Sequence, residues 1–381
     1  MRPSVSPAER EHSEAVARHI GAWIAAAGGW ISFERFMELA LYAPGLGYYS
    51  AGGIKIGPGG DFTTAPEVSD MFSACVAQQC AEVLARTGGS IFEFGAGTGR
   101  MCATVLETLA SCDALPEQYA ILEVSADLRE RQRERIARLP REIGARVVWL
   151  DALPATALRG VILANEVLDA LPCQRFAIRD ESIQALGVEV SDEGAFIESA
   201  QPADDRLAAA VDELPALPDD YSSEICLRVA PWIASVAQCL ESGVVLLFDY
   251  GLPRAHYYHP QRDRGTLRCH FKQFVHDDPF INVGLQDITA WVDFTRVADA
   301  AVAAGLEVPG FATQTAFLLA NGIDRLIEDA EGSVERARRA TEARQLLMPG
   351  EMGEAFKVMA LSRDFAPPLR GFALQDLRDS L

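Results

Sequence analysis

The chain has 381 residues, of which 49% are hydrophobic and 23% are charged, and 34 Lys and Arg against 54 Asp and Glu give a net charge of −20. The hydrophobic fraction excludes disorder as the main state, and the length suggests two domains or one large domain with insertions. The excess of acids argues against nucleic acid as a partner, because binding phosphates requires clustered Lys and Arg. A cationic ligand or partner fits this charge better, although most of the acids are expected to be ordinary surface residues.

The N-terminus lacks the apolar core of a signal peptide, and its arginines alternate with acids, unlike those of a transit peptide. The longest uncharged stretch, residues 308–323, contains Pro309 and Gly310 and is shorter than the roughly 18 apolar residues of a membrane span. We therefore expect no membrane insertion and a cytoplasmic location. Only three of the 34 basic residues are Lys, which hints at a bacterial source with a GC-rich genome.

Metal and hydrolase chemistry both lack their sequence signals. The eight Cys form no Cys-x-x-Cys pair, and His256 and His259 have no third ligand at a fixed spacing, so we expect no metal site. The chain also has no Gly-x-Ser-x-Gly motif, which disfavours a serine hydrolase.

Two helices are predicted near the N-terminus, over residues 8–27 and 33–42, with Ser32 as the N-cap of the second. A glycine-rich loop follows at residues 45–60. These helices and the loop precede the first predicted strand of the sheet.

Short runs rich in Ile, Val, Leu and Phe recur through the middle of the chain and predict buried parallel strands. They lie at residues 90–95, 119–124, 146–150, 160–164 and 243–248. Segments of helical period at residues 100–110 and 125–139 separate the first three runs. This β-α-β-α-β order predicts an α/β fold with a parallel sheet covered by helices.

The chain between the fourth and fifth strands interrupts this pattern. Apolar and polar residues alternate over 174–200, which predicts an antiparallel β meander inserted into the sheet domain, and residues 225–240 have a helical period. Residues 252–286 are too long for a structural turn and are predicted to be a loop that covers a site.

The last elements complete a seven-stranded sheet. A helix is predicted at 293–306 and strands at 314–319 and 355–361, separated by the helical stretch 323–347. The expected domains are residues 1–70 as a helical region with a covering loop, 71–172 and 225–381 as the core, and 173–224 as a β-rich subdomain on the substrate side.

Each predicted parallel strand ends in or next to a polar or acidic residue. Ligands of open α/β sheets bind outside the carboxyl ends of the strands. Buried charges need a partner or a ligand, so this recurrence predicts a binding crevice along that edge. The residues are Glu93, Glu123, Asp151, Asn165 with Glu166, and Asp249.

The glycines after the first strand indicate the cofactor. A dinucleotide-binding loop requires a small residue at position 100, where this chain has Arg, which weakens the case for NAD. The run Glu93-Phe-Gly-Ala-Gly-Thr-Gly99 instead resembles motif I of class I S-adenosylmethionine-dependent methyltransferases, in which glycines let the backbone approach the cofactor. This resemblance implies that Glu123 binds the ribose hydroxyls and Asp151 the adenine amine.

A more specific resemblance extends over most of the chain. The segments are ALYAPGLGYY (40–49), GDFTTAPEVS (60–69), EVS (123–125), NEVLDALP (165–172), RGTL (264–267), DITAWVDF (287–294) and MGEAFKV (352–358). In this order they resemble the MidA-type methyltransferase family, which includes the mitochondrial complex I assembly factor that methylates an arginine of a core subunit. The family more often has His where this chain has Trp291.

The resemblance implies a Rossmann-like, seven-stranded class I methyltransferase sheet with an N-terminal helical region and an inserted antiparallel β meander. It also implies S-adenosyl-L-methionine as cofactor and methyl transfer to an arginine of a protein, such as a subunit of respiratory complex I. Carried over by position, the cofactor-binding residues are Asp61, Thr64, Pro66, Glu93, Gly95, Gly97, Gly99, Glu123, Asp151 and Asn165.

The acceptor chemistry suggests further catalytic residues. A carboxylate pair that grips two N–H groups of a guanidinium would fix its plane and hold a nitrogen against the sulfonium methyl group. Glu166 and Asp169 are the predicted pair, and Asn165 is predicted to orient the complex. His276, beside Asp277 in the covering loop, is the predicted acceptor of the departing proton.

Two other functions remain open from the sequence. The first is a respiratory-complex assembly factor or chaperone that acts by binding, and the second is a small-molecule methyltransferase. The long loops and the meander argue for a large acceptor, because a small acceptor needs only a modest pocket. A nicotinamide oxidoreductase is a remote fourth possibility.

Overall fold

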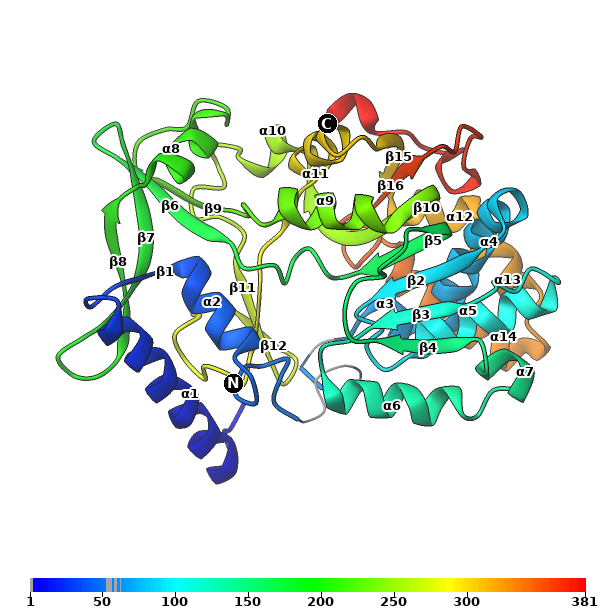
Figure 1. Cartoon of the computed structure of the whole chain (residues 1–381), viewed down its shortest axis with the longest axis horizontal. Coiled ribbons are helices and arrows are strands. Elements are labelled where there is room, and N and C mark those ends of the chain that lie inside the picture. Colours follow the sequence, from blue (N-terminus) through cyan, green and yellow to red (C-terminus); the bar gives the residue numbers. More distant parts are fainter. Residues whose placement is uncertain (1–2, 53–56, 58–59, 62) are drawn as a thin grey trace. The chain divides into compact units, whose positions relative to one another are not determined.

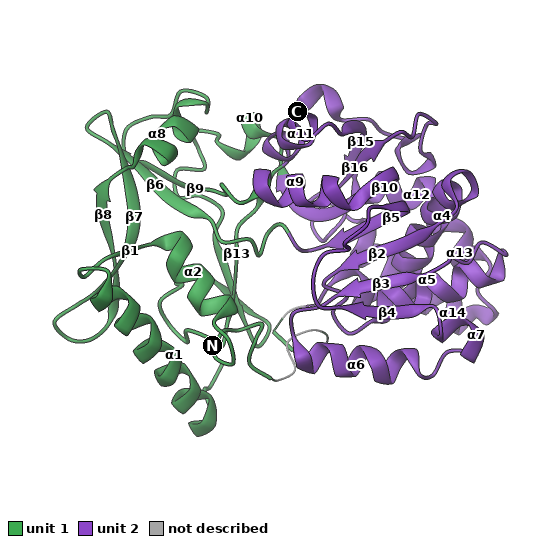
Figure 2. Ribbon diagram, in the orientation of Figure 1, with its two compact units in different colours: residues 1–62, 168–229, 252–293 green, residues 63–167, 230–251, 294–381 purple. Residues whose placement is uncertain are grey.

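The computed structural model describes residues 3–52, 57, 60–61 and 63–381, so part of the expected glycine-rich loop lies outside the described residues. The chain divides into two compact units, coloured green and purple in Figure 2. Unit 1 consists of residues 1–62, 168–229 and 252–293. Unit 2 consists of residues 63–167, 230–251 and 294–381.

Unit 2 is built on a mostly parallel sheet with the strand order β15-β16-β10-β5-β2-β3-β4 (Figure 1). The strands are β2 (Ser90–Phe94), β3 (Tyr119–Leu122), β4 (Val147–Leu150), β5 (Leu158–Asn165), β10 (Leu240–Leu252), β15 (Glu307–Thr313) and β16 (Phe356–Arg363). β16 is antiparallel to both β10 and β15, whereas the pairs from β10 to β4 are parallel. The five apolar runs of the sequence therefore form the parallel part of the sheet.

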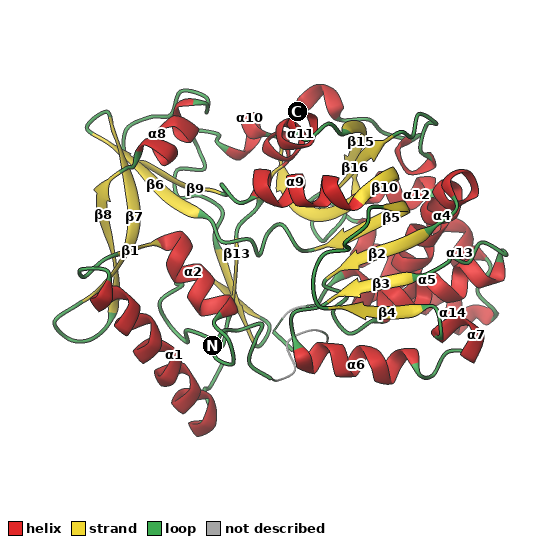
Figure 3. Ribbon diagram, in the orientation of Figure 1, coloured by secondary structure: helices red, strands yellow, loops and turns green. Residues whose placement is uncertain are grey.

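Helices cover the sheet of unit 2 on both faces (Figure 3). They are α3 (Ala65–Val68), α4 (Asp70–Thr87), α5 (Arg100–Ser111), α6 (Ala126–Ile136), α7 (Arg141–Gly144), α9 (Val229–Cys239), α11 (Phe294–Ala303), α12 (Gln314–Ala320), α13 (Ile323–Glu328) and α14 (Gly332–Leu347), with short 3-10 turns at Arg370–Phe372 and Arg378–Ser380. The ring of Phe248 on β10 packs 5.4 Å from Phe72 of α4 and 5.3 Å from Phe317 of α12, centroid to centroid. These aromatic contacts tie two helices to one face of the sheet.

Two expectations for this sheet are wrong. Residues 314–319 form the helix α12 and not a strand, because the Thr313 side chain caps the N–H of Ala316 and the preceding residues already form β15. The sheet also has an eighth strand, β14 (Val292–Asp293), so the predicted count of seven is one short. A strand of two residues is too short to produce a periodic signal in the sequence.

Unit 1 joins three segments that are far apart in the sequence. Its helices are α1 (Pro7–Ala26), α2 (Phe33–Tyr42), α8 (Asp205–Asp212) and α10 (Arg254–Tyr257). One sheet contains β1 (Ile31–Ser32), β6 (Gln174–Arg179), β7 (Ser182–Val190), β8 (Phe196–Pro202) and β9 (Tyr221–Ile225), and a second contains β11 (Arg268–Phe271), β12 (Phe274–His276) and β13 (Asp287–Thr289). Phe36, Val188, Cys269 and Ile288 are buried in one shared core. The shared core explains why the segments predicted as separate parts form one unit.

Residues 252–286 were predicted to be a loop, but they contain regular secondary structure. They contain α10, β11 and β12, and β11 pairs with both β12 and β13. Thr266, in the RGTL segment before β11, donates its backbone N–H to the buried carboxylate of Glu224 at 2.7 Å. Gly265 has φ +74°, and an added Cβ would lie 2.3 Å from a Glu224 oxygen. The RGTL motif is therefore explained by packing in unit 1.

Replacing Gly265 with alanine is expected to lower the free energy of unfolding by about 2 kcal/mol, because the methyl group would enter the Glu224 carboxylate and the backbone would be strained. Chemical denaturation measures this change. Gly194→Ala is the matched control, since Gly194 has φ +82° but no atom within 4 Å of an added Cβ. Equal losses for the two variants would show that backbone strain alone, without the Glu224 contact, accounts for the effect.

Candidate active site

The carboxyl ends of the parallel strands lie side by side at one edge of the sheet in unit 2. The register pairs Leu247 with Ala164, Ala164 with Phe94, Phe94 with Leu122, and Leu122 with Leu150. The residues that follow these positions therefore share one edge of the sheet. They include Gly95 and four of the residues predicted at strand ends, Glu123, Asp151 and Asn165 with Glu166. The predicted Glu93 and Asp249 instead lie within β2 and β10.

The glycine loop connects β2 to α5 in an unusual backbone conformation. Gly95, Gly97 and Gly99 have φ of +59°, +53° and +79°, a region that L side chains rarely adopt. An added Cβ on Gly99 would lie 3.2 Å from the Cα of Gln132, so α6 packs directly on this loop. At these three glycines the loop thus presents bare backbone at the start of α5, the arrangement required for close approach of a ligand.

Glu123 and Gln132 connect the end of β3 to the glycine loop. The amide of Gln132 donates to Glu123 Oε2 and to the carbonyl of Gly97, both at 2.9 Å, and accepts the indole N–H of Trp149 at 2.9 Å. Ser125 donates its backbone N–H to Glu123 Oε1 at 2.9 Å. Burial raises the pKa of Glu123, and these hydrogen bonds partly oppose the rise. The carboxylate keeps lone pairs for a further donor such as a hydroxyl.

Asp151 lies at the end of β4, where its side chain is 88% exposed and binds Arg129 at 2.6 Å. Arg129 also donates to the carbonyls of Glu123 and Leu150 at 3.3 and 2.7 Å, so it holds the ends of β3 and β4 together. Next to Glu123, the side chain of Val124 is 76% exposed and offers an apolar surface at the same edge. The predicted adenine contact of Asp151 stays a prediction.

Glu93 occupies a different environment from the other strand-end acids. It is only 1% exposed and accepts a hydrogen bond from the Tyr119 hydroxyl at 2.8 Å. Burial raises the pKa of Glu93 to about 8, the bond from Tyr119 opposes the rise, and the charge of Glu123 adds to it. The raised pKa favours the protonated form of Glu93 at neutral pH, and direct contact of Glu93 with the cofactor stays a prediction.

Asn165 ends β5, and Glu166 follows it in a strained conformation. Glu166 has φ +53°, its N–H donates to the carbonyl of Phe248 at 2.8 Å, and Asn165 Nδ2 donates to its carboxylate at 3.0 Å. The Oδ1 atom of Asn165 is buried and accepts no hydrogen bond from any described residue. Strain of this kind in a non-glycine residue is concentrated at functional sites.

The sequence did not identify two residues that support this edge, Glu67 and Gln132. Glu67 of α3 follows Thr64 and Pro66, accepts a hydrogen bond from Thr98 in the glycine loop at 2.5 Å, and lies 3.7 Å from Arg100. Within unit 2 this contact joins the TTAPEVS segment to the glycine loop. Neither residue has a local signal in the sequence, because each functions through a contact with a distant segment.

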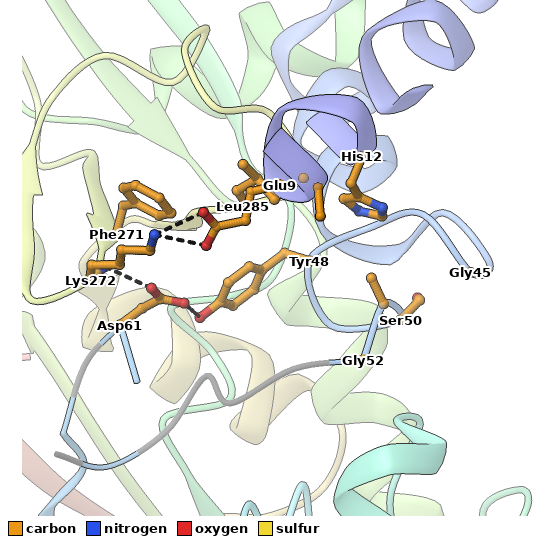
Figure 4. Close-up of a pocket in the computed structure, with 13 residues that line it drawn as sticks. Glu9, His12, Gly45, Tyr48, Ser50, Gly52, Asp61, Phe271, Lys272 and Leu285 are labelled. Atoms are coloured by element: carbon orange, nitrogen blue, oxygen red, sulfur yellow. Dashed lines mark hydrogen bonds and ion pairs between the residues drawn. The ribbon is translucent and has the colours of Figure 1, made fainter. Parts of the chain in front are cut away.

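Two other predicted acids, Asp61 and Asp169, lie in unit 1. Tyr48 donates to Asp61 Oδ2 at 2.8 Å, and the N–H of Lys272 donates to Asp61 Oδ1 at 2.7 Å (Figure 4). Tyr49 donates to the carboxylate of Asp287 at 2.9 Å. Burial, and next the charge of Asp169, raise the pKa of Asp287 to about 8, so these two acids lie near each other.

The Asp61 contacts form one wall of a cavity of about 590 Å³ in unit 1 (Figure 4). Lys272, from the turn between β11 and β12, also binds Glu9 at 2.8 Å, so its ammonium is already paired. Asp61 therefore links Tyr48 to this turn, with one carboxylate oxygen bonded to each. The predicted role of Asp61 toward the cofactor stays a prediction.

His276 lies on β12 and accepts the N–H of Asp278 at 3.2 Å. β11 lies between β12 and β13, so one strand separates His276 from Asp287. On β11, His270 pairs in register with Asp287, and burial, with His276 and Arg268, lowers the pKa of His270 to about 4. The structure thus brings Asp169 close to Asp287 and leaves His276 on another strand.

The edge of unit 2 fits S-adenosyl-L-methionine. The glycine loop would bind the methionine part of the cofactor, and Glu123 would accept hydrogen bonds from the ribose hydroxyls. The buried Oδ1 of Asn165 would accept a hydrogen bond from a donor group of the ligand. When bound, this cofactor supplies an electrophilic methyl group on a sulfonium. No described group of His, Cys, Asp and Glu is arranged to hold a metal ion, and none of the described helices is long and apolar enough to cross a membrane. The fold and the site define an S-adenosyl-L-methionine-dependent methyltransferase.

Comparison with known proteins supports the same class. Residues 75–312 match the model of a family described as "Putative S-adenosyl-L-methionine-dependent methyltransferase". A protein from Burkholderia thailandensis, crystallised with S-adenosyl-homocysteine and described as a "likely methyl transferase", is 40% identical, with a TM-score of 0.95 over 100% of both chains. The chain belongs to this methyltransferase family.

More distant relatives are enzymes of animals. The zebrafish (Danio rerio) protein named "Protein arginine methyltransferase NDUFAF7, mitochondrial" is 26% identical over 92% of this chain and 87% of its own length. The mouse (Mus musculus) protein of the same name is 28% identical over 93% of this chain and 86% of its own length. The names of these relatives state that they methylate protein arginine.

Proposed function

We propose that this methyltransferase transfers its methyl group to an arginine side chain of a protein. The relatives named protein arginine methyltransferases support this acceptor, because they align with nearly the whole chain and not only with the cofactor-binding part. We further propose a subunit of a respiratory complex I as the target and the bacterial cytoplasm as the place of action.

The observation that carries the proposal is the conformation of Glu166. A guanidinium is a poor nucleophile because its lone pairs are delocalised, so an enzyme has to fix its plane and hold one nitrogen against the methyl group. Glu166 is held at φ +53° by Phe248 and Asn165, on the same edge as the glycine loop. A carboxylate fixed in this way suits the planar N–H pair of arginine, and it suits the single ammonium of lysine less well.

Asp169 is the second carboxylate that we propose for the acceptor, and His276 is the residue that we propose for the departing proton. Asp169 is 4% exposed and lies near the buried Asp287 in unit 1. The two charges disfavour each other, which would favour binding of a cationic side chain there. Asp169→Asn and His276→Ala test these assignments separately from Glu166.

Glu166→Gln is expected to reduce turnover of an arginine-containing substrate about thirtyfold, since one charged hydrogen-bond pair to the guanidinium is lost. The dissociation constant for S-adenosyl-L-methionine should stay unchanged. Mass spectrometry of the methylated product measures the turnover, and titration calorimetry measures cofactor binding. Glu241→Gln, an exposed acid near the amino end of β10, is the matched control. Full turnover by Glu166→Gln would refute the proposed role.

Two alternatives are distinguished by the same measurements. A protein that binds the cofactor but yields no methylated product in a cell lysate would be an assembly factor that acts by binding. Methylated small molecules without methylated protein would indicate a small-molecule methyltransferase. Arginine-methylated protein that depends on added enzyme supports the proposal.

A further inference from the structure

Strand β8 forms an open edge of the larger sheet in unit 1. It pairs with β7 over all seven of its residues, and no described strand pairs with its other side (Figure 3). Its edge is roughly 23 Å long at about 3.3 Å per residue. Unpaired backbone groups on such an edge are a template for another extended segment.

The register shows which backbone groups face outward. The N–H of Ser191 donates to the carbonyl of Ala195 at 2.8 Å and closes the turn between β7 and β8. Hydrogen-bonded pairs alternate along antiparallel strands, so Ile197 and Ser199 bond to β7 while Glu198 and Ala200 direct their N–H and C=O groups outward. No described residue bonds to these outward groups of Glu198 and Ala200. Ile197, at 43% exposure, and the nearby Val190, at 41%, add exposed apolar surface.

The segment of the chain that contains this edge is strongly acidic. Residues 168–229 contain 14 Asp and Glu against 4 Arg and no Lys, a net charge of −10 from 62 of the 381 residues. Eleven of these acids are exposed, among them Asp192 and Glu193 before β8 and Asp204 and Asp205 after it. About half of the charge of the chain thus lies in this segment.

We propose that β8 accepts a basic, extended segment of a protein partner as an added strand. The acids at both ends of the edge attract Arg and Lys side chains, while main-chain hydrogen bonds to Glu198 and Ala200 supply the pairing. The same acids oppose pairing with a second copy of this chain, because like charges would face each other across the new edge. The partner rests on the proposed function, in which the substrate is a protein.

The test uses the whole 381-residue chain and a labelled seven-residue peptide that alternates Arg and Val, and fluorescence anisotropy measures their binding. Ala200→Pro removes one outward N–H and leaves the bonds to β7 in place, so binding should weaken about fivefold. Ala200→Val keeps the N–H and is the matched control. A peptide with Glu in place of Arg should not bind, and added salt should weaken the Arg peptide.

A peptide methylated on its backbone nitrogens gives a second test on the unaltered protein, and it should bind at least about fivefold more weakly. The proposal would be overturned if the methylated peptide bound as tightly as the unmethylated one, or if Ala200→Pro bound the peptide as tightly as the unaltered protein. It would also be overturned if sedimentation showed a dimer of this chain that Ala200→Pro dissociates. The measurement contains no cofactor, so it is independent of arginine methylation. If the protein methylates arginine but Ala200→Pro binds the peptide as tightly as the unaltered protein, only the proposed docking edge is refuted. If the peptide binds at β8 but no protein arginine is methylated, only the proposed arginine acceptor is refuted.

Discussion

Replacing Glu123 with alanine is expected to weaken binding of S-adenosyl-L-methionine about a hundredfold, because charged hydrogen bonds to two ribose hydroxyls are lost together. The carboxylate is positioned for this role by Ser125 and Gln132, each at 2.9 Å, at the end of β3. Binding of S-adenosyl-homocysteine should weaken by a similar factor, since the ribose is the same in both ligands. Titration calorimetry with each ligand measures the two dissociation constants.

The control for this variant is Glu130→Gln. Glu130 lies on the same helix, α6, as Gln132, and its side chain is 64% exposed. The Glu130→Gln variant should bind both ligands as the unaltered protein does. Circular dichroism should show the same fold for Glu123→Ala, Glu130→Gln and the unaltered protein. An unchanged dissociation constant for a well-folded Glu123→Ala would mean that another residue holds the ribose.

The stability of the protein is expected to fall as the pH rises from about 4.5 to about 8, and Glu93 is one of the causes. Its pKa is raised from 4.5 to about 8 in the folded protein, mainly by burial. Between these values the unfolded chain has lost the proton that the folded chain keeps, so the free energy of unfolding decreases with rising pH. The loss is about 1 kcal/mol per pH unit for such a group, and it stops above the folded pKa.

Glu93→Gln removes this contribution, while an amide oxygen can still accept the Tyr119 hydroxyl. Denaturation at a series of pH values should show a shallower decline for the variant than for the unaltered protein. Part of the decline will remain, because burial raises the pKa of Asp287 to about 8 as well. Glu107→Gln, an exposed acid on α5, should leave the profile unchanged. Identical profiles for Glu93→Gln and the unaltered protein would contradict the buried, protonated state.

The parallel strands and the polar residues at their ends were predictable from the sequence. Buried strands such as β2, β5 and β10 are short, continuous apolar runs, and this signal depends only on neighbouring residues. The N-cap of α2 was equally local, and Ser32 caps the N–H of Arg35 as expected. The glycine loop was recognisable because its backbone conformation requires glycine at fixed positions.

Only the tertiary structure decided the remaining features, because they depend on contacts between distant segments. The assembly of unit 1 from three segments follows from a shared core that includes Phe36, Val188 and Cys269. Gln132 connects the glycine loop to Glu123 although its own helix reads as a charged surface helix. The protonated state of Glu93 follows from burial, which the sequence does not specify. Local patterns therefore determined the sheet and the cofactor, and long-range packing determined how the site is supported.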